Sequence, residues 1–408
     1  MRVRGLCLAA IAALAVLAAG CGGVGSSPAA EPGGNQLTVY SSLPLQGPSG
    51  PAAAQIVNGE KLALAQAGGH VGRFAVGYVS LDDANPISGR LDPGAAESNA
   101  EMAARDTMTI AYLGDLDSAA TAVSLPLINA AGIPQVSPGS PYAGLTSGLD
   151  AGQDEPARFY PSGVRTFARL QPGDAAQALA QVRLMGSLHA HTLFMLEDEN
   201  AFQKPLAQMI ATFAQEAGVT VLARDTIASG SGQRFTGEIE KIVVAHPDAV
   251  LYTGASIPAA LTLWAELRAA DPSVPMLGSS ALADEAFASQ LEDASRTYLT
   301  TPVLAADRYP PAAARVLGDY RSKFGGRPGA YALYGYEAMS VVLDAIRAAG
   351  AHGNDRKAVI AALMRTRDRP SVLGTYSINA DGETTLSPYG VDRIAHGRLV
   401  FYGTYATR

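Results

Sequence analysis

Short apolar runs rich in β-branched residues alternate with longer stretches of helical periodicity from about residue 37 onwards. In the first half we expect strands at 37–43, 74–80, 109–113 and 134–137, and helices at 51–67, 94–105 and 118–131. The pattern resumes with strands at 166–170, 192–196, 219–226 and 249–253, and helices at 174–186, 202–217, 234–245 and 258–270. This alternation predicts parallel sheets with helices on both faces, which is the α/β class.

Two regions depart from the simple alternation. Residues 138–163 are rich in Gly, Pro, Ser and Asp and predict a long surface excursion near a boundary between two α/β lobes. The last hundred residues predict helices at 310–324, 331–349 and 356–366, then a strand at 372–378, a turn at Asn379-Ala380-Asp381-Gly382 and two final strands.

An internal echo links the two halves of the chain. The stretch IAYLGDLDSAATAVSLPLINAAGIPQVSPGS (110–140) can be laid beside VLYTGASIPAALTLWAELRAADPSVPMLGSS (250–280). Both give a strand, a glycine, a small polar turn, a helix and a second short strand, with a constant offset between them. Constant spacing of this kind is typical of duplicated units, so we expect two lobes of similar architecture.

The turn YLGDLDSAA (112–120) raises the question of whether Ser118 only caps the helix that follows it. In open parallel sheets, ligands bind beyond the carboxyl ends of the strands, where helix N-termini face outward. Two facing lobes would present Ser118 and Gly139-Ser140 from one side and Ala255-Ser256 and Ser279-Ser280 from the other. This convergence favours a binding role over capping alone.

The N-terminus predicts export. A basic start, an apolar run from Leu6 to Leu17 and small residues before Cys21 form a secretory signal at 1–20, too short for an ordinary membrane span. The ending LAAGC resembles the lipobox of bacterial lipoproteins, in which the cysteine is acylated. Residues 21–36, rich in Gly, Ser and Pro, predict a flexible lipid-anchored tether. Because Cys7 lies in the segment expected to be removed, no internal disulfide is expected.

Composition and motifs exclude several functions. The chain has 37 acidic and 30 basic residues and only 16% charged residues, which argues against nucleic-acid binding. It has no Gly-x-Ser-x-Gly elbow, phosphate-binding loop or Cys-x-x-Cys pair, so an enzyme is not expected. The motif His189-Ala190-His191 could suggest a metal, but surface exposure explains it better. We expect neither a metal site nor a cofactor.

Several motifs, taken in order, resemble a known family. They are YSSLPLQGPSG, NGEKLALAQAGG, YVSLDDA, IAYLGDLDSAA, AGIPQVSPGSP, RTFARLQPGDAAQALA and ALYGYEAM. Together they look like the extracellular solute-binding lipoproteins of ABC importers, in the leucine/isoleucine/valine-binding branch of the type I periplasmic-binding fold. The resemblance runs from about Leu37 to Tyr402.

The resemblance implies two Rossmann-like lobes joined by three crossover segments, near Arg169–Pro172, Thr300–Pro302 and Leu373–Tyr376. The expected N-terminal lobe is 37–168 plus 303–372, and the expected C-terminal lobe is 169–302 plus 373–408. In this fold the lobes close on a ligand by a hinge motion.

The resemblance also implies site residues. The turn at Ser118 and the segment Gly139-Ser140 would hold a ligand carboxylate, although Pro141 stands where a threonine is expected. Across the cleft, Phe202 keeps an aromatic plane, while Ala255 and Ser280 stand where an aromatic residue and a glutamate are expected. The other residues expected at the site are Asp117, Asp174 and Ser256.

Alternatives remain for three of these residues. Asp174 could instead cap a helix, and Phe202 could belong to the core. Asp117 could be a solvated turn residue that opposes an anionic ligand. The loss of the glutamate makes burial of a ligand ammonium costly, so a less charged or differently charged solute is possible.

We therefore expect an extracytoplasmic lipoprotein that binds a small polar solute, an amino acid or related metabolite, for an ABC importer. The expected partners are the solute, permease subunits and the membrane, reached through lipidated Cys21, and the protein is expected to be a monomer. The alternative is a sensory receptor of the same fold that passes its signal to a partner.

Overall fold

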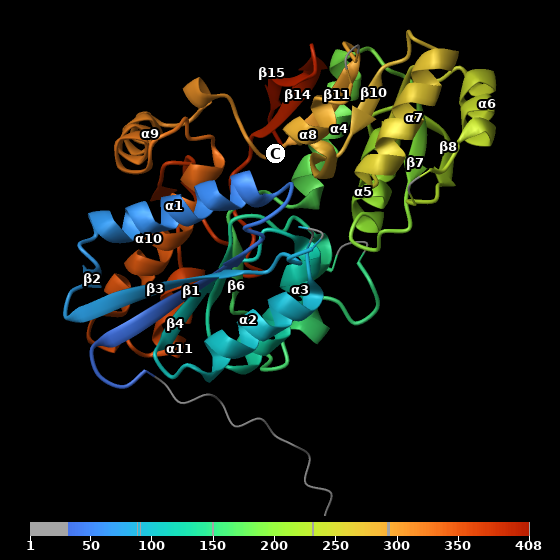
Figure 1. Ribbon diagram of the computed structural model, residues 1–408. Helices are drawn as coiled ribbons and strands as arrows, with labels where there is room; N and C mark the ends of the chain where they lie inside the picture. The colour runs from blue at the N-terminus through green and yellow to red at the C-terminus, as the bar shows by residue number, and fades with distance from the viewer. Residues whose placement is uncertain are drawn as a thin grey trace, which may run out of the picture.

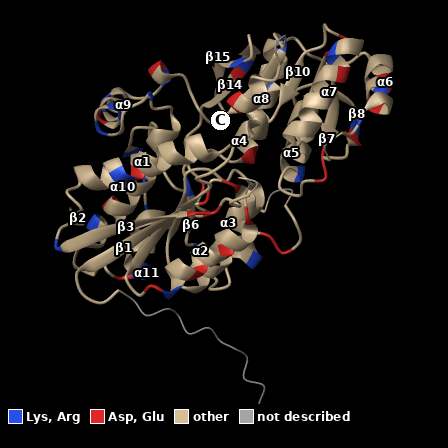
Figure 2. Cartoon of the chain, in the orientation of Figure 1, with Lys and Arg blue, Asp and Glu red and all other residues tan. Residues whose placement is uncertain are grey.

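The computed structural model describes residues 32–87, 89, 91–148, 151–230, 232–291 and 294–407. These residues form two α/β lobes, each built on its own sheet (Figure 1). The expected signal peptide and Cys21 lie outside the described residues. Basic and acidic residues are interspersed along both lobes (Figure 2).

The first sheet has six strands in the order β2-β3-β1-β4-β5-β6. All neighbouring strands are parallel except β2 and β3. Their bounds are β1 Gln36–Leu43, β2 His70–Val71, β3 Phe74–Asp82, β4 Thr109–Leu113, β5 Gln135–Ser137 and β6 Phe167–Arg169. Every residue of β4 is buried, as its apolar sequence TIAYL requires of a central strand.

Helices cover both faces of this sheet (Figure 1). Val39 packs in a core with α1, α9, α10 and α11, while the next residue, Tyr40, packs with α2 and α3 on the opposite face. Successive side chains of a strand point to opposite faces, which produces this division. The helices are α1 Gly50–Gln66, α2 Pro93–Arg105, α3 Ser118–Ala130, α9 Pro311–Phe324, α10 Tyr331–Ala349 and α11 Arg356–Met364.

The second sheet has seven strands in the order β15-β14-β11-β10-β9-β7-β8. Strands β7 to β11 are parallel, and β14 and β15 extend the sheet as an antiparallel pair. The bounds are β7 Thr192–Glu197, β8 Thr220–Thr226, β9 Ala249–Tyr252, β10 Met276–Gly278, β11 Thr297–Thr301, β14 Tyr389–Ala395 and β15 Arg398–Tyr405. One face packs on α4 and α5, and the other on α6, α7 and α8. These helices are α4 Asp174–Ser187, α5 Lys204–Glu216, α6 Thr236–Ala245, α7 Ile257–Ala270 and α8 Glu285–Ala288.

The two sheets share one strand order, which supports the duplication inferred from sequence. The order β3-β1-β4-β5-β6 in the first sheet corresponds to β8-β7-β9-β10-β11 in the second. The two echoing stretches fold as β4-α3-β5 and β9-α7-β10, at equivalent places in their sheets. The fold is therefore the expected pair of Rossmann-like lobes.

The chain passes between the sheets three times, after β6, after β11 and before β14. The third passage comes later than the expected Leu373–Tyr376, because Tyr376, Ile378 and Leu386 all pack in the core of the first lobe. The strand expected at 372–378 is also shorter. A turn closed by Ser371 and Gly374 leaves only a small hairpin of β12 Arg369–Pro370 and β13 Thr375–Tyr376.

The Gly- and Pro-rich stretch after β5 is more than a surface excursion. Tyr142, Leu145, Phe159 and Tyr160 are buried and pack with Leu125 of α3 in a separate cluster. Aromatic side chains spaced along an irregular segment supply this small core. The stretch is therefore anchored against the first lobe beside the start of α3.

Candidate functional site

A cavity of ≈ 470 Å³ lies between the two lobes. In each sheet the chain order reverses at one point, between β1 and β4 in the first and between β7 and β9 in the second. Ligands of open parallel sheets bind beyond the carboxyl ends of the strands at such a point. The cavity is lined by Pro44, Ser49, Ala52, Leu91, Leu116, Asp117, Ser118, Ala119, Pro141, Gln171, Asn200, Phe202, Gln203, Ala255, Ser280, Ala281, Ala283, Asp284, Pro302 and Tyr331.

The start of α3 forms one wall, with Asp117 and not Ser118 as its N-cap. An Asp117 oxygen accepts a hydrogen bond from the backbone N–H of Ala119 at 2.7 Å. Ser118 is the first helical residue, and its Oγ accepts from the N–H of Tyr142 at 3.2 Å. The capping role expected for Ser118 was therefore wrong, whereas its place at the cavity agrees with the expected convergence.

A buried carboxylate holds this turn in shape. Asp115 accepts hydrogen bonds from the hydroxyls of Tyr112, at 3.1 Å, and Ser124. The backbone oxygen of Asp115 accepts from Ser137 Oγ at 2.6 Å and from Ser140 Oγ at 3.0 Å. The loop after β4 and the loop after β5 are thus joined behind the cavity wall.

Gly139 and Ser140 belong to this support and do not line the cavity. Ser140 is fully buried, and its hydroxyl also lies 2.7 Å from Thr121 Oγ1. A Cβ at Gly139 would approach the backbone oxygen of Leu116 to 2.5 Å, so only glycine fits there. Gly139 donates its N–H to Ser137 Oγ at 3.0 Å and Ser140 donates its N–H to the Leu116 oxygen at 3.1 Å, so these groups are engaged within the protein. Their expected contact with a ligand stays a prediction.

Asp174 is likewise outside the cavity. It is buried in the first turn of α4, and its Oδ2 accepts from the N–H of Ala143 at 3.0 Å. It lines a smaller cavity of ≈ 270 Å³ together with Arg169 and Glu383. Burial raises the pKa of Asp174 to about 7, against the opposing effect of the positive charge on Arg169. Asp174 therefore does not line the ≈ 470 Å³ cavity, and its expected contact with a ligand stays a prediction.

The second lobe contributes Phe202, Ala255 and Ser280 to the wall. The Phe202 ring packs edge-on against Tyr142, with ring centroids 5.1 Å apart. Ser280 donates a hydrogen bond to Gln177 Oε1 at 2.6 Å. Ser256, by contrast, caps α7 and donates its hydroxyl to the backbone oxygen of Ser229, so it does not line the cavity.

Several lining residues were not found by sequence reasoning. Pro44 and Ser49 follow β1, and Asn200 and Gln203 follow β7. Strands β1 and β7 flank the points of reversal together with β4 and β9. The rule that ligands bind at such points would have found them had the strand order been known. Gln171 and Pro302 come from the crossover segments, and Asp284 and Tyr331 begin α8 and α10.

The cavity holds two acidic side chains from opposite lobes, Asp117 and Asp284. The Asp117 carboxylate is exposed to the cleft but surrounded by protein, and this burial raises its pKa above the usual value. Burial, followed by the negative charge of Asp284, raises the pKa of the Tyr331 hydroxyl to about 12. Tyr331 is therefore a neutral phenol near an acidic residue at the cavity wall.

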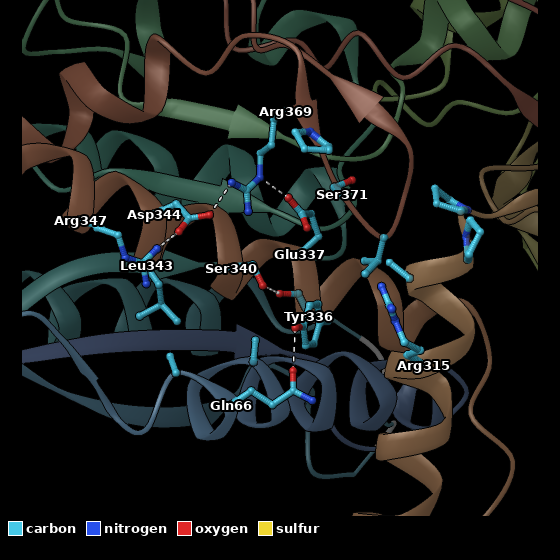
Figure 3. Close-up of a pocket in the computed structure, with 17 residues that line it drawn as sticks. Gln66, Arg315, Tyr336, Glu337, Ser340, Leu343, Asp344, Arg347, Arg369 and Ser371 are labelled. Atoms are coloured by element: carbon cyan, nitrogen blue, oxygen red, sulfur yellow. Dashed lines mark hydrogen bonds and ion pairs between the residues drawn. The ribbon is translucent and has the colours of Figure 1, made fainter.

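A second cavity of ≈ 640 Å³ lies within the first lobe, between α1, α9, α10 and β12 (Figure 3). Its charged groups largely neutralise one another. Arg369 contacts Glu337 at 2.6 Å and Asp344 at 2.5 Å, and Glu337 also accepts from the Tyr376 hydroxyl. Because only one lobe lines it and its main charges are paired, the interlobe cavity is the stronger candidate.

Within the described residues, no group of three or more His, Cys, Asp or Glu side chains could hold a metal ion. The helices of the described chain also include none with the length and apolar character needed to cross a membrane.

A family model for periplasmic binding proteins matches residues 41–395. The chain therefore belongs to the periplasmic binding protein family, as its motifs and its two-lobed fold indicate. A search of curated proteins returned no match.

Solved structures share the fold at low identity. A leucine-binding protein LivK from Thermotoga maritima has a TM-score of 0.74 and 20% identity, covering 91% of this chain and 99% of its own. LivJ from Streptococcus pneumoniae, solved with isoleucine, has a TM-score of 0.72 and 20% identity, with coverage of 91% and 99%. A solute-binding protein from R. palustris, solved with benzoate, has a TM-score of 0.70 and 18% identity, with coverage of 91% and 96%. Neighbours of one fold thus bind chemically different solutes.

Proposed function

We propose that this protein is the extracytoplasmic substrate-binding lipoprotein of an ABC importer, and that it binds a small polar solute between its lobes. The observation that carries the proposal is the ≈ 470 Å³ cavity at the reversal points of both sheets, lined by residues of both lobes. That volume lies within the range of small-molecule sites, and its mixture of small, apolar and polar side chains is typical of them. Amino acids and related metabolites are the solutes of suitable size. The protein captures and delivers its solute as a monomer, without catalysis.

The two lobes act as the moving bodies. The first lobe is 37–169 plus 303–386, and the second is 170–302 plus 389–407. Only the three crossover segments join the sheets covalently, so small backbone changes in these segments can open and close the cavity. Gln171 and Pro302, in two of these segments, also line the cavity. Their position couples ligand contact to closure, and an ABC permease would recognise the closed form.

The N-terminus supplies the anchor. The signal at 1–20 directs export, and acylation of Cys21 holds the mature chain at the outer face of the cell membrane. The substitution Cys21→Ala is expected to release the protein from the membrane fraction. Retention of Cys21→Ala in that fraction would contradict lipid anchoring.

Binding is tested with the purified chain from Gln36 to Arg408, by thermal shift across a library of amino acids, amines, amides and small carboxylates, followed by calorimetry of each hit. A ligand that binds only the folded state raises the free energy of unfolding, by an amount that grows with the logarithm of its concentration above the dissociation constant. We expect at least one member to bind at a stoichiometry of one. Absence of binding across the library would contradict the proposed solute-binding function.

A further inference from the structure

The charged side chains described at the interlobe cavity are all acidic. Asp117 reaches it from the first lobe and Asp284 from the second, and the described lining residues include no Lys, Arg or His. Two carboxylates that close over a small volume without a cation repel each other and lose hydration. A positively charged ligand offsets both the repulsion and the loss of hydration when the lobes close.

The helix starts that face the cavity already hold carboxylates of the protein itself. Backbone N–H groups at a helix N-terminus are the usual partners of an anionic ligand. At α3 the N–H of Ala119 donates to Asp117. At the equivalent start of α7, the N–H groups of Ala255 and Ser256 donate to Asp198 Oδ2 at 2.9 and 3.3 Å. A ligand carboxylate would have to compete with these internal anions.

The backbone next to the start of α3 offers few free N–H groups for a ligand anion. Pro141 lines the cavity beside α3 and has no N–H. The N–H of Ser140 donates to the backbone oxygen of Leu116 at 3.1 Å, and the N–H of Tyr142 donates to Ser118 Oγ. The N–H groups of Ser140 and Tyr142 are therefore used within the protein.

The rest of the wall suits a cation with an apolar body. Phe202 and Tyr331 bring aromatic rings from opposite lobes, and Ala52, Leu91 and Leu116 add apolar surface. Aromatic faces attract ammonium groups, including methylated ones, and attract them most strongly when water is excluded.

From these contacts we propose that the solute is a cation, an amine or methylated ammonium compound without a free carboxylate, held between Asp117 and Asp284. This inference rests on the proposed solute-binding function and narrows it. A free amino acid fits poorly because its carboxylate would meet the Asp117 carboxylate at the start of α3.

The test uses matched pairs that differ only at the carboxyl group: L-leucine with L-leucinamide and L-phenylalanine with L-phenylalaninamide, together with choline and benzoate. The purified chain is titrated with each by calorimetry at pH 7. We expect binding of one or more of the cationic compounds, at least tenfold tighter than binding of the matched acid. Equal or tighter binding of an acid overturns the inference and leaves the solute-binding function standing. Absence of binding in this set and in the wider library overturns both.

Charge variants assign the effect to the cavity. Asp117→Asn and Asp284→Asn keep an oxygen for helix capping but remove the negative charge. Each is expected to weaken binding of the best cation at least tenfold. The matched control is Asp355→Asn, the same change at the N-cap of α11 on the far side of the first lobe, which should leave binding unchanged. Equal effects of all three variants would overturn the assignment.

Arg90 is the basic residue nearest in sequence to the lining residue Leu91 and lies outside the described residues. Arg90→Gln is therefore measured beside the charge variants. The proposal requires cation binding within threefold of the unaltered protein. A bound carboxylate whose affinity falls with this substitution would overturn the proposal.

Discussion

Arg169 and Glu383, 214 residues apart in the chain, form a two-point ion pair at the junction of the two lobes. The Nε of Arg169 donates to Glu383 Oε2 at 2.9 Å, and its NH2 group donates to Oε1. The same guanidinium donates to the backbone oxygens of Ser140 and Tyr142 at 2.6 and 2.9 Å. Arg169, at the start of the first crossover, thus binds both the loop after β5 and the segment around Glu383 that precedes the third passage.

Removal of the acidic partner leaves a buried positive charge. The Arg169 side chain is 1% exposed, so Glu383→Ala is expected to lower the free energy of unfolding by ~3–5 kcal/mol. Urea unfolding measures the change. Glu101→Ala, which breaks the exposed pair with Arg105, is the control and should cost ~0.5 kcal/mol or less. Equal effects of the two substitutions would contradict a structural role for the buried pair.

Two glycines allow α1 and α10 to touch along their backbones. A Cβ at Gly59 would overlap the backbone oxygen of Ala332, and a Cβ at Gly335 would overlap that of Ile56. Neither glycine has a positive φ, so the requirement is close approach and not an unusual backbone angle. The two helices form the main cover of one face of the first sheet.

Gly59→Ala and Gly335→Ala are therefore expected to destabilise the first lobe by ~2 kcal/mol or more, since added atoms in a packed contact force the helices apart. Thermal and urea unfolding measure the change. Gly318→Ala in α9 is the matched control, because its Cβ would meet no atom within 4 Å. That change should stabilise by ~0.5–1 kcal/mol through helix propensity. Destabilisation by Gly318→Ala to the same degree would show that close contact is not the cause.

Buried acids beneath the cleft give the stability a pH dependence. Asp83 is fully buried, and among the described residues its Oδ1 has no hydrogen-bond partner. Burial, followed by the charge of Asp115, raises the pKa of Asp83 to about 8. Burial raises the pKa of Asp115 to about 7. The folded protein therefore binds more protons than the unfolded chain between about pH 4 and pH 8, and its stability falls as the pH rises through this window.

Asp83→Asn removes one of these titrating groups. We expect the variant to lose a measurable part of the decline in unfolding free energy between pH 5 and pH 8, because an amide does not ionise. Urea unfolding at both pH values measures it, with Asp92→Asn, a partly exposed helix cap outside this buried pair, as the control. An unchanged decline in Asp83→Asn would show that Asp83 does not titrate in this range.

Much of the fold could be predicted because the spacing of apolar residues distinguishes strands from helices. The run TIAYL bounded by Gly114 predicts a buried strand, and β4 has those bounds. The echo between the halves predicts the shared strand order, since equivalent units fold alike. The third passage was misplaced because Tyr376, Ile378 and Leu386 look alike in either lobe, and only packing assigns them to the first.

The site was less predictable because it depends on where side chains point. Ser118, Ala255 and Ser280 follow strands and could be found from position alone, whereas Phe202 was expected only from the family resemblance. Asp174 could not be placed, since both a cleft carboxylate and a buried partner of Ala143 begin a helix in the same way. Asp284 and Tyr331 begin elements far apart in sequence, so their meeting at the cavity follows only from the three-dimensional fold.

Filling the cavity separates binding from stability. Ala255 lines the cavity after β9, with its backbone N–H held by Asp198, so a larger side chain at this position extends into open volume. Ala255→Trp is expected to abolish binding of any solute identified by thermal shift while changing the free energy of unfolding by less than ~1 kcal/mol, because no packed atoms are displaced. Calorimetry and urea unfolding measure the two quantities. Val244→Trp on α6 is the control, at a position 80% exposed and outside the cavity lining, and should bind normally. Unchanged solute affinity in Ala255→Trp would show that the ligand binds elsewhere than between the lobes.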